Sequence, residues 1–377
     1  MSNINSILEQ AVTEGTVPFV VAMHGDADGI NYAGAAGDAV NGRAAADDTV
    51  FRVFSMTKAI GSLAAMILID RGKLSMDTPV SDVLPAWNDL KVLEKFDGDT
   101  PVMRDPKTSA TIRNLATHTS GMEYEFWNGD VPKYMEKTEH PTILSGLKSS
   151  LKYPLTTDPG TRWGYGPSID WLGQVVEAID GRRIDVFCKE EIFEPMGMSS
   201  TAFEPDGLAD RIADVAIRGE DGVFGPMEIA PPTKPEMYGM GHALYSTAGD
   251  YMRFLRMILN KGVLDGNRIL SEASVTNMLA DQMNGLAFQP MQSVSPLTAD
   301  VELDGDPVHS FMAVLHRADV PAKRSAGTNS WAGVLNTHYW VDPKRNLAAV
   351  LMTQTLPFVE PSFLSLYDAY ERAVYAS

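Results

Sequence analysis

The sequence predicts an α+β fold, in which an antiparallel sheet is flanked by helices and an inserted lobe is mainly helical. Strand-like segments gather near both ends of the chain, at residues 18–26, 30–38, 334–342 and 347–355. Amphipathic spacing at residues 4–15 and 362–376 predicts terminal helices that cover these strands. Residues 76–230 have more helical spacing, with loops that are punctuated by proline and glycine.

The length of the chain predicts two lobes, because 377 residues exceed the usual size of a single domain. We expect residues 1–75 and 231–377 to form one domain that contains the antiparallel sheet. Residues 76–230 are expected to form the inserted, mainly helical domain. The stretch from 282 to 330 has weak periodicity and is predicted to form long loops.

The composition is typical of a globular protein, with 44% hydrophobic and 21% charged residues. A formal net charge of −18 argues against nucleic acid and anionic membrane as partners, because both require cationic patches. The first 15 residues lack the pattern of a secretory signal, and no apolar run is long enough to span a bilayer. We therefore expect a cytoplasmic protein, and the sequence leaves open whether it forms a homo-oligomer.

Metal and cofactor motifs are absent from the sequence. No two of the seven histidines have the i, i+4 spacing of a zinc-binding helix, and no glycine loop of the phosphate-binding kind occurs. We therefore expect no cofactor. The single cysteine, Cys188, excludes an intrachain disulfide and is expected to be a small buried helix residue.

Ser55 and Lys58, in the run FRVFSMTK at 51–58, form the strongest chemical signal in the sequence. Ser55 lies between an alternating aromatic segment and the apolar run at 59–69, which predicts a strand-to-helix junction. Residues three apart on a helix share a face, so the hydroxyl and the ammonium are expected to share a pocket. Free N–H groups at the start of the helix favour a developing anion there.

The Ser-x-x-Lys spacing is not specific by itself. It recurs at Ser145/Lys148 and at Ser149/Lys152. Both of these copies lie in a lysine-rich stretch that is predicted to be an exposed helix, so we expect neither serine to be a nucleophile.

Tyr165, in PGTRWGYGPSIDWLG, is a second candidate for chemistry. Proline and glycine on both sides predict a loop, and the apolar periodic run from Ile169 to Ile179 predicts a helix directly after it. A phenol with its ordinary pKa of about 10 is a poor base unless a cation favours its ionised form, and Lys58 is the obvious cation. Without the serine motif, a packing role for this tyrosine would be preferred.

The run SWAGV at 330–334 is a third candidate, at the predicted start of the strand 334–342. A small residue and a glycine allow a substrate to approach strand backbone, and a free N–H there could bind an oxyanion. A simple bulge or bend at the start of a strand explains the fragment equally well.

With these elements in this order, the sequence resembles the serine β-lactamase and penicillin-binding-protein superfamily. Within it, the sequence is similar to the family VIII carboxylesterases, which look like class C β-lactamases. The resemblance covers nearly the whole chain, through SMTK at 55–58, TIRNLATHTSGM at 111–122, PGTRWGY at 159–165, IFEPMGM at 192–198, GMGHALYSTAGDYMRF at 239–254 and NTHYWVDPKRNLAAVLMTQ at 336–354. It implies a β-lactamase/transpeptidase-like fold.

The resemblance also implies a role for each candidate. Ser55 matches the acylating nucleophile, Lys58 its electrostatic or proton-transfer partner, and Tyr165 the general base that later acts as general acid. The backbone N–H groups of Ser55 and Val334 match the oxyanion donors, because Val334 follows the segment 331–333 that takes the place of the family's Lys-Thr-Gly.

Two departures from the family pattern point to neutral esters. Trp331 replaces the lysine of Lys-Thr-Gly, and a tryptophan offers apolar area where the lysine would pair with a substrate carboxylate. Pro167 stands where asparagine or serine is usual, although Ser168 could substitute for it. We therefore expect a carboxylesterase, a serine hydrolase that works through an acyl-enzyme. The alternatives are a β-lactamase, a D-amino-peptidase or amide hydrolase, an acyltransferase, or a non-catalytic ligand-binding relative.

The expected partner is a small-molecule ester with an apolar moiety. Aromatic residues follow the THTSG motif and recur in other segments that are predicted to border the cleft, although each is individually more often a core residue. The predicted substrate-binding residues are Trp331, Gly333, Trp127, Tyr124, Phe126, Tyr238 and Phe288. The α/β-hydrolase motif Gly-x-Ser-x-Gly is absent.

Overall fold

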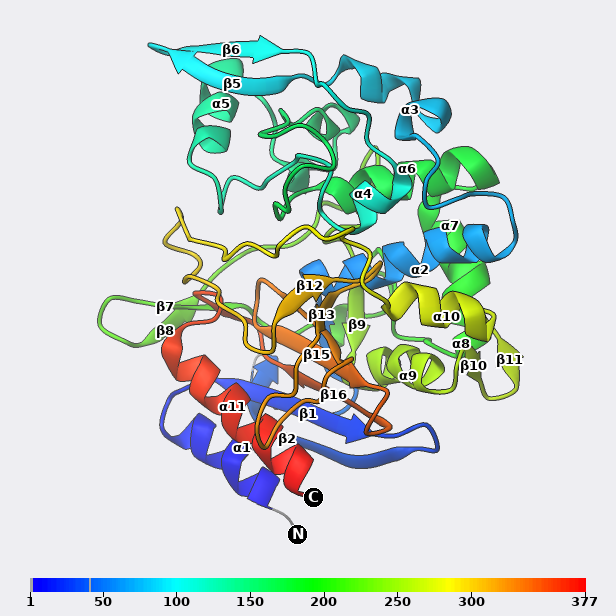
Figure 1. Ribbon diagram of the computed structural model, residues 1–377. Helices are drawn as coiled ribbons and strands as arrows, with labels where there is room; N and C mark the ends of the chain where they lie inside the picture. Colours follow the sequence, from blue (N-terminus) through cyan, green and yellow to red (C-terminus); the bar gives the residue numbers. More distant parts are fainter. Residues whose placement is uncertain (1–2, 41) are drawn as a thin grey trace.

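The computed structural model describes residues 3–40 and 42–377, and its largest element is an eight-stranded sheet in the lower half of Figure 1. Every neighbouring pair in this sheet is antiparallel. The strands are, in spatial order, β12 (Pro307–His309), β13 (Val314–His316), β14 (Asn329–Gly333), β15 (Thr337–Asp342), β16 (Leu347–Met352), β1 (Phe19–Gly25), β2 (Ile30–Val40) and β3 (Arg43–Ala44). The predicted fold class is therefore confirmed.

Helices cover both faces of this sheet, which explains why β1 is buried along its whole length and apolar from Phe19 to Met23. Its residues Val20 and Ala22 pack with α1 (Asn3–Thr13) and α11 (Pro361–Ala376), whereas Val21 and Met23 belong to the core on the opposite face. Helix α9 (Ala248–Leu259) contacts β1, β15 and β16. The two predicted terminal helices are thus confirmed and lie side by side (Figure 1).

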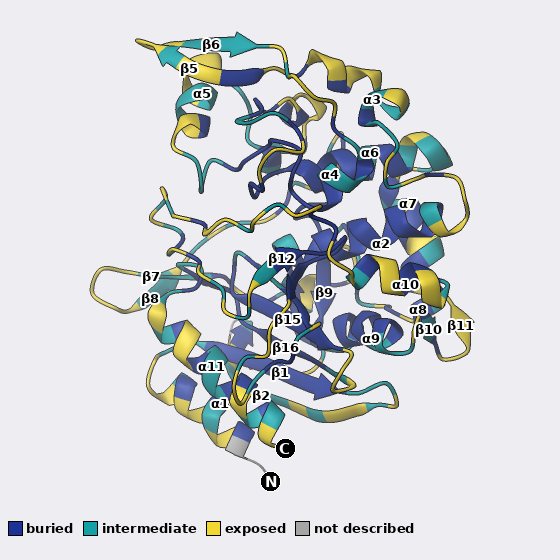
Figure 2. Cartoon of the chain, in the orientation of Figure 1, coloured by how far each residue is buried: buried dark blue, intermediate teal, exposed yellow. Residues whose placement is uncertain are grey.

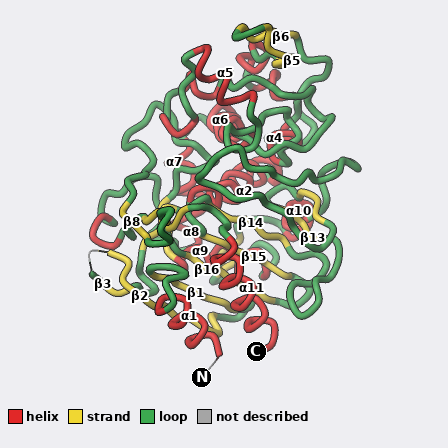
Figure 3. Tube along the Cα trace, turned by 90° about the vertical axis from the view of Figure 1, so that its left-hand side faces the viewer, coloured by secondary structure: helices red, strands yellow, loops and turns green. Residues whose placement is uncertain are grey.

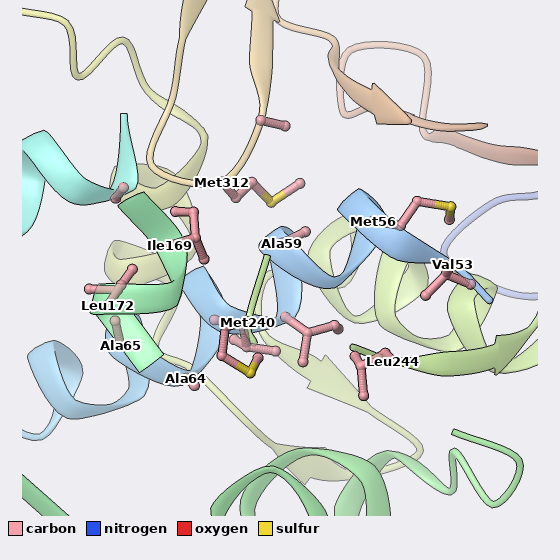
Figure 4. Packing of buried hydrophobic residues seen from close by; sticks show 14 of the residues in the cluster. Val53, Met56, Ala59, Ala64, Ala65, Ile169, Leu172, Met240, Leu244 and Met312 are labelled. Carbon is pink, nitrogen blue, oxygen red and sulfur yellow. The ribbon is translucent and has the colours of Figure 1, made fainter. Parts of the chain in front are cut away.

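Helix α2 (Thr57–Asp70) is buried on almost every side and carries Lys58 in its first turn. Its composition is apolar all round, as expected for a helix inside a core. Figure 4 shows Ala59, Ala64 and Ala65 of α2 among side chains from other elements. Gly61 permits a close approach, because a Cβ there would lie 3.0 Å from Cγ2 of Ile169 and from Cβ of Met240.

The upper half of the molecule consists mainly of helices and loops (Figure 3), and its outer elements are the more exposed ones (Figure 2). Its helices are α3 (Val80–Val83), η2 (Pro85–Asp89), α4 (Ile112–Ala116), α5 (Asp130–Thr138), α6 (Ser168–Asp180) and α7 (Ile184–Cys188). After α7, η5 (Lys189–Phe193) and α8 (Glu194–Met196) lead down to α9, which α8 contacts (Figure 1). Cys188 is buried in α7, as predicted. The domain boundaries at residues 75 and 230 stay a prediction.

Short strands and turns complete the chain. The small sheets are β4 (Val50–Arg52) with β9 (Tyr245–Thr247), β5 (Val92–Asp97) with β6 (Thr100–Arg104), β10 (Val263–Leu264) with β11 (Asn267–Arg268), and β7 (Ala216–Arg218) between β8 (Phe224–Pro226) and β17 (Thr355–Leu356). Two further helices are η6 (Ala209–Arg211) and α10 (Glu272–Leu279). No helix within residues 3–40 and 42–377 is long and apolar enough to cross a membrane.

One secondary-structure prediction was largely confirmed and one was wrong. Residues 282–330 consist mostly of loops, as predicted, and also contain β12 and β13, each of only three residues, which is too short to produce a visible period of two. The lysine-rich stretch forms two 3-10 turns, η3 (Ile143–Ser145) and η4 (Lys148–Leu151), rather than an exposed helix. Gly146, with φ of +68°, ends the first turn and separates the two.

The strand predicted at 334–342 also begins later than expected. Residues 334–336 form the turn between β14 and β15, so the segment 331–333 ends one strand and does not enter the next. Asn336 takes φ of +59°, and its side-chain amide donates hydrogen bonds to Thr355 and to the carbonyl of Pro357. A sequence pattern of apolar residues does not reveal a turn that is held by a distant side-chain partner.

Candidate active site

Ser55 lies in the 3-10 turn η1 (Phe54–Met56), between β4 and the start of α2. The predicted strand-to-helix junction is therefore confirmed. Phe54 has φ of +40°, a backbone conformation that residues other than glycine rarely adopt. The surrounding contacts must therefore hold the backbone in this conformation. Two backbone hydrogen bonds of Val53 hold this turn in place. Its N–H donates to the carbonyl of Leu244 at 3.1 Å, and its carbonyl accepts from the N–H of Met56 at 3.0 Å.

Lys58 is buried, with 2% of its surface exposed, and points to Ser55. Its Nζ donates hydrogen bonds to Oγ of Ser55 at 3.1 Å and to the carbonyl oxygen of Gly241 at 2.8 Å. The same ammonium lies 5.1 Å from the ring centre of Tyr124 and 4.9 Å from that of Tyr165. Aromatic faces of this kind stabilise a cation that has lost its water.

Tyr165 reaches this cluster from the loop before α6, as the sequence predicted. Its carbonyl accepts from the N–H of Tyr124 at 3.0 Å. The N–H of the preceding residue, Gly164, donates to the carbonyl of His118 at 2.9 Å. The imidazole of His118 packs edge to face on the phenol at 4.9 Å. The indole N–H of Trp331 donates to the phenolic oxygen at 3.2 Å.

Strand β14 contacts η1, the turn that carries Ser55. A Cβ on Gly333 would overlap the carbonyl oxygen of Val53 and lie 2.5 Å from Oγ1 of Thr337, so only glycine allows this approach. The Thr337 hydroxyl donates to the same Val53 carbonyl at 3.3 Å. Ser55 and Val334, the two predicted oxyanion donors, both line the adjoining cavity.

This cavity has a volume of about 240 Å³ and mostly apolar walls. Four of the predicted substrate-binding residues line it, namely Tyr124, Phe126, Trp127 and Trp331. Sequence reasoning missed other wall residues, which come from loops, the short turn η3 and the two-residue strand β17: Ile143, Leu144, Ile229, Met291, Leu297, Val301, Leu303, Leu356 and Phe358. No periodic pattern marks them in the sequence, because each of these segments contributes only a few side chains.

The other three predicted substrate-binding residues do not line the cavity, and we correct that expectation. Tyr238 is buried, with its hydroxyl donating to Glu204 and its ring packed on Phe203. Phe288 packs on Trp163 with ring centres 4.1 Å apart. Gly333 lies against Val53 beside η1, as described above.

Ser168 does not substitute for the polar residue that Pro167 replaces. Its hydroxyl is fully buried and hydrogen-bonded to the hydroxyl of Ser120 at 2.7 Å. It is absent from the cavity lining, and Pro167, two residues after Tyr165, provides no polar side chain in place of the family's asparagine or serine.

A buried carboxylate and an imidazole lie behind Lys58. Burial raises the pKa of Asp170 to about 6, although the Lys58 ammonium opposes this shift. Burial and the same ammonium lower the pKa of His242 to about 3, so this imidazole is neutral at pH 7. The part of the chain that the structure describes contains no group of three or more His, Cys, Asp or Glu side chains that could hold a metal ion.

The serine turn, the buried lysine and the tyrosine loop, at the edge of an antiparallel sheet, define a protein of the serine β-lactamase-like superfamily. The chain belongs to the Beta-lactamase family, whose model matches residues 4–369. The resemblance found in the sequence is therefore confirmed at the level of the superfamily.

Named relatives include both acyltransferases and an esterase. The chain is 29% identical over 349 residues to acyltransferase calJ of Penicillium decumbens, covering 88% of this chain and 81% of the relative. It is 29% identical over 346 residues to lovastatin esterase of Penicillium rubens, covering 87% and 85%. The structure of simvastatin synthase (LovD) from Aspergillus terreus superposes with a TM-score of 0.85 at 27% identity, covering 99% of this chain and 97% of the other.

Proposed function

We propose that this protein cleaves carboxylic esters through an acyl-enzyme on Ser55, as a carboxylesterase of the family VIII kind. The observation that carries this proposal is the hydrogen bond from Lys58 to Ser55, with the ring of Tyr165 against the same ammonium. A ligand-binding protein without catalytic activity would not need a nucleophile, a buried cation and a phenol at one point.

The proposed reaction has two steps. Tyr165, acting as a phenolate beside the Lys58 ammonium, takes the proton of the Ser55 hydroxyl as the serine oxygen attacks the ester carbonyl. The backbone N–H groups of Ser55 and Val334 stabilise the oxyanion, and Tyr165 returns the proton to the departing alcohol. A water molecule, activated by the same phenol, then attacks the acyl group and releases the acid and the free serine.

The charges around the cavity favour neutral esters over β-lactams, which carry a carboxylate. Trp331 stands where the β-lactamases have a lysine. Arg324, which also lines the cavity, is engaged in two hydrogen bonds with Glu371, of 2.7 and 2.8 Å. Two exposed acidic residues, Asp300 and Glu302, line the cavity as well and would repel an anionic substrate.

Acyl transfer to an alcohol is the second candidate activity. It uses the same acyl-enzyme, and only the nucleophile of the second step differs. The names of the relatives favour it, since calJ is an acyltransferase and LovD is a synthase, whereas lovastatin esterase favours hydrolysis. Product analysis with p-nitrophenyl butyrate, in water and with an added alcohol, distinguishes the two: hydrolysis gives butyric acid and transfer gives a new butyrate ester.

The test of the nucleophile compares Ser55→Ala with Ser149→Ala. We expect Ser55→Ala to lower the turnover of p-nitrophenyl butyrate by about a thousandfold or more, and to abolish labelling by a fluorophosphonate. Ser149 is an exposed serine that also precedes a lysine by three residues, so its variant should behave as wild type. Near wild-type turnover by Ser55→Ala would refute the proposal. Faster turnover of nitrocefin than of the ester by the wild type would favour a β-lactamase.

A further inference from the structure

Asp170 is a buried carboxylate that the proposed mechanism does not yet use. It lies in the first turn of α6, and 1% of its surface is exposed. Its Oδ1 accepts a hydrogen bond from the backbone N–H of Gly241 at 2.9 Å. Its Oδ2 is buried and has no hydrogen-bond partner among the described residues. A buried oxygen of this kind is costly unless a nearby charge compensates it.

Asp170 and Lys58 both form hydrogen bonds with the backbone of Gly241. Gly241 donates its N–H to Asp170, and its carbonyl accepts from Nζ of Lys58 at 2.8 Å. The contact is tight, because a Cβ on Gly241 would lie 2.6 Å from Oδ2 of Asp170 and 3.0 Å from Oη of Tyr124. The carboxylate is thus separated from the ammonium by one residue of backbone.

The other titratable groups that face Asp170 do not compensate its charge. Nδ1 of His242 lies 3.6 Å from Oδ1, but this imidazole is neutral at pH 7 because burial and Lys58 lower its pKa. Burial, and secondarily the negative charge of Asp170, raise the pKa of Tyr124, so its phenol is neutral as well. The Lys58 ammonium remains as the cation that attracts this carboxylate.

Lys58 in turn has no direct carboxylate partner among its hydrogen bonds, which go to Ser55 and Gly241. A buried ammonium with no anion nearby is strongly destabilised. Asp170 supplies that anion at a distance, where it does not compete with Ser55 for the N–H groups of the lysine.

We propose that Asp170 is a positioning residue for acylation, which in its ionised form holds Gly241 and the Lys58 ammonium in place against Ser55. This inference rests on the function proposed above. Its consequence is a pH dependence with a definite sign. The pKa of Asp170 is about 6, so the carboxylate is present above pH 6 and becomes protonated as the pH falls through that value. We therefore expect the activation of Ser55 to decrease as the Asp170 carboxylate becomes protonated.

The experiment measures the rate of fluorophosphonate labelling at Ser55, and kcat/KM for p-nitrophenyl butyrate, between pH 5 and 8. Asp170→Asn keeps an oxygen for the Gly241 N–H but removes the charge. We expect it to lower both rates between roughly tenfold and a hundredfold at pH 7.5, the size of effect that a small misplacement of a catalytic group causes. We also expect its rates to lack the decline near pH 6, so that the ratio of wild-type to variant rates becomes smaller as the pH falls from 7.5 to 5.

Asp250→Asn is the matched control. Asp250 is also a buried carboxylate whose pKa burial raises, but it accepts from the N–H of Ser200 and the hydroxyl of Thr201, away from the cavity. Its variant should keep the wild-type pH profile. Asp170→Ser, which leaves room for water, is a second variant in case the asparagine protein does not fold.

Three outcomes decide the matter. Wild-type rates in a folded Asp170 variant, or a decline near pH 6 that persists in it, would overturn the role of Asp170. If neither variant folds, a labelling rate of the wild type at Ser55 that stays constant from pH 7 to 5 would also overturn the role of Asp170. Failure of the wild type to label at Ser55 would instead overturn the proposed function itself, whatever the variants do.

Discussion

The indole N–H of Trp331 donates a hydrogen bond to the phenolic oxygen of Tyr165 at 3.2 Å. The two rings also pack edge to face, with centres 4.9 Å apart and an interplanar angle of 66°. The residue that stands in place of a lysine therefore still provides a donor to the proposed base. This donor is uncharged, so it can stabilise a phenolate without attracting a substrate carboxylate.

Trp331→Phe should separate the contribution of the hydrogen bond from that of the ring packing, because it keeps an aromatic ring and removes the N–H. We expect kcat for p-nitrophenyl butyrate to fall by about tenfold or more, since a hydrogen bond to a charged group contributes roughly 1.5–3 kcal/mol. KM should change little. Steady-state kinetics check this, with Trp127→Phe as control, since Trp127 lines the same cavity. An unchanged kcat would mean that the indole N–H does not assist the base.

Trp127→Ala should change selectivity more than activity. Trp127 lines the cavity and packs against the core, so its removal should weaken binding of bulky apolar groups. Burial of a large side chain contributes about 1.5–3 kcal/mol, so we expect the kcat/KM ratio of a bulky ester to an acetate to fall roughly tenfold to a hundredfold.

The control for this selectivity test is Tyr238→Phe. Tyr238 does not line the cavity, and its hydroxyl is occupied by Glu204. It should leave the ratio of bulky to short esters as in the wild type. An unchanged ratio in Trp127→Ala would remove Trp127 from the substrate pocket.

Gly333→Ala should impair the nucleophile turn from β14. The new methyl group would overlap the Val53 carbonyl, which is backbone and cannot rotate away. We expect the strand or the turn to shift, with a loss of kcat of roughly a hundredfold if Ser55 and the oxyanion donors move apart by about 1 Å. The matched control is Gly225→Ala on β8, where a Cβ would meet nothing within 4 Å. Equal activity of both variants would show that the close contact between Gly333 and the Val53 carbonyl is not needed for catalysis.

The reacting groups were predictable from the sequence because each carries a local signal. Ser55 and Lys58 lie three residues apart at a strand-to-helix junction, and Tyr165 lies in a loop bounded by proline and glycine just before a helix. The approach of Lys58 to Ser55 follows from helical spacing, whereas the approach of Tyr165 depends on tertiary packing, which the family resemblance implied.

The cavity walls were harder to predict, because an aromatic residue in a loop packs into the core as readily as into a pocket. Tyr238 and Phe126 look alike in the sequence, yet only Phe126 lines the cavity. Asp170 did have a signal that went unused: it is an acidic residue within the otherwise apolar start of α6. Buried carboxylates in such positions need a partner, which can direct the search to a functional site.

Acid should destabilise this protein through His338. Burial, and secondarily the Arg324 guanidinium, lower the pKa of His338 to about 3, and its ring packs among Phe358, Phe363 and Tyr367. In the unfolded chain the pKa is about 6.5, so below that pH the unfolded state binds a proton that the folded state does not. The contribution of His338 to the free energy of unfolding is therefore fully present above pH 6.5 and decreases as the pH falls toward 3.

His338→Phe should remove this dependence while it preserves the aromatic packing. We expect the slope of the unfolding free energy against pH, between pH 6 and 4, to become smaller by about 1.4 kcal/mol per pH unit, the value for one proton. Urea unfolding at several pH values measures this slope in the variant and the wild type. At pH 7.5, where the histidine is neutral in both states, this difference disappears. An unchanged slope would show that His338 takes up its proton as readily in the folded protein as in the unfolded chain.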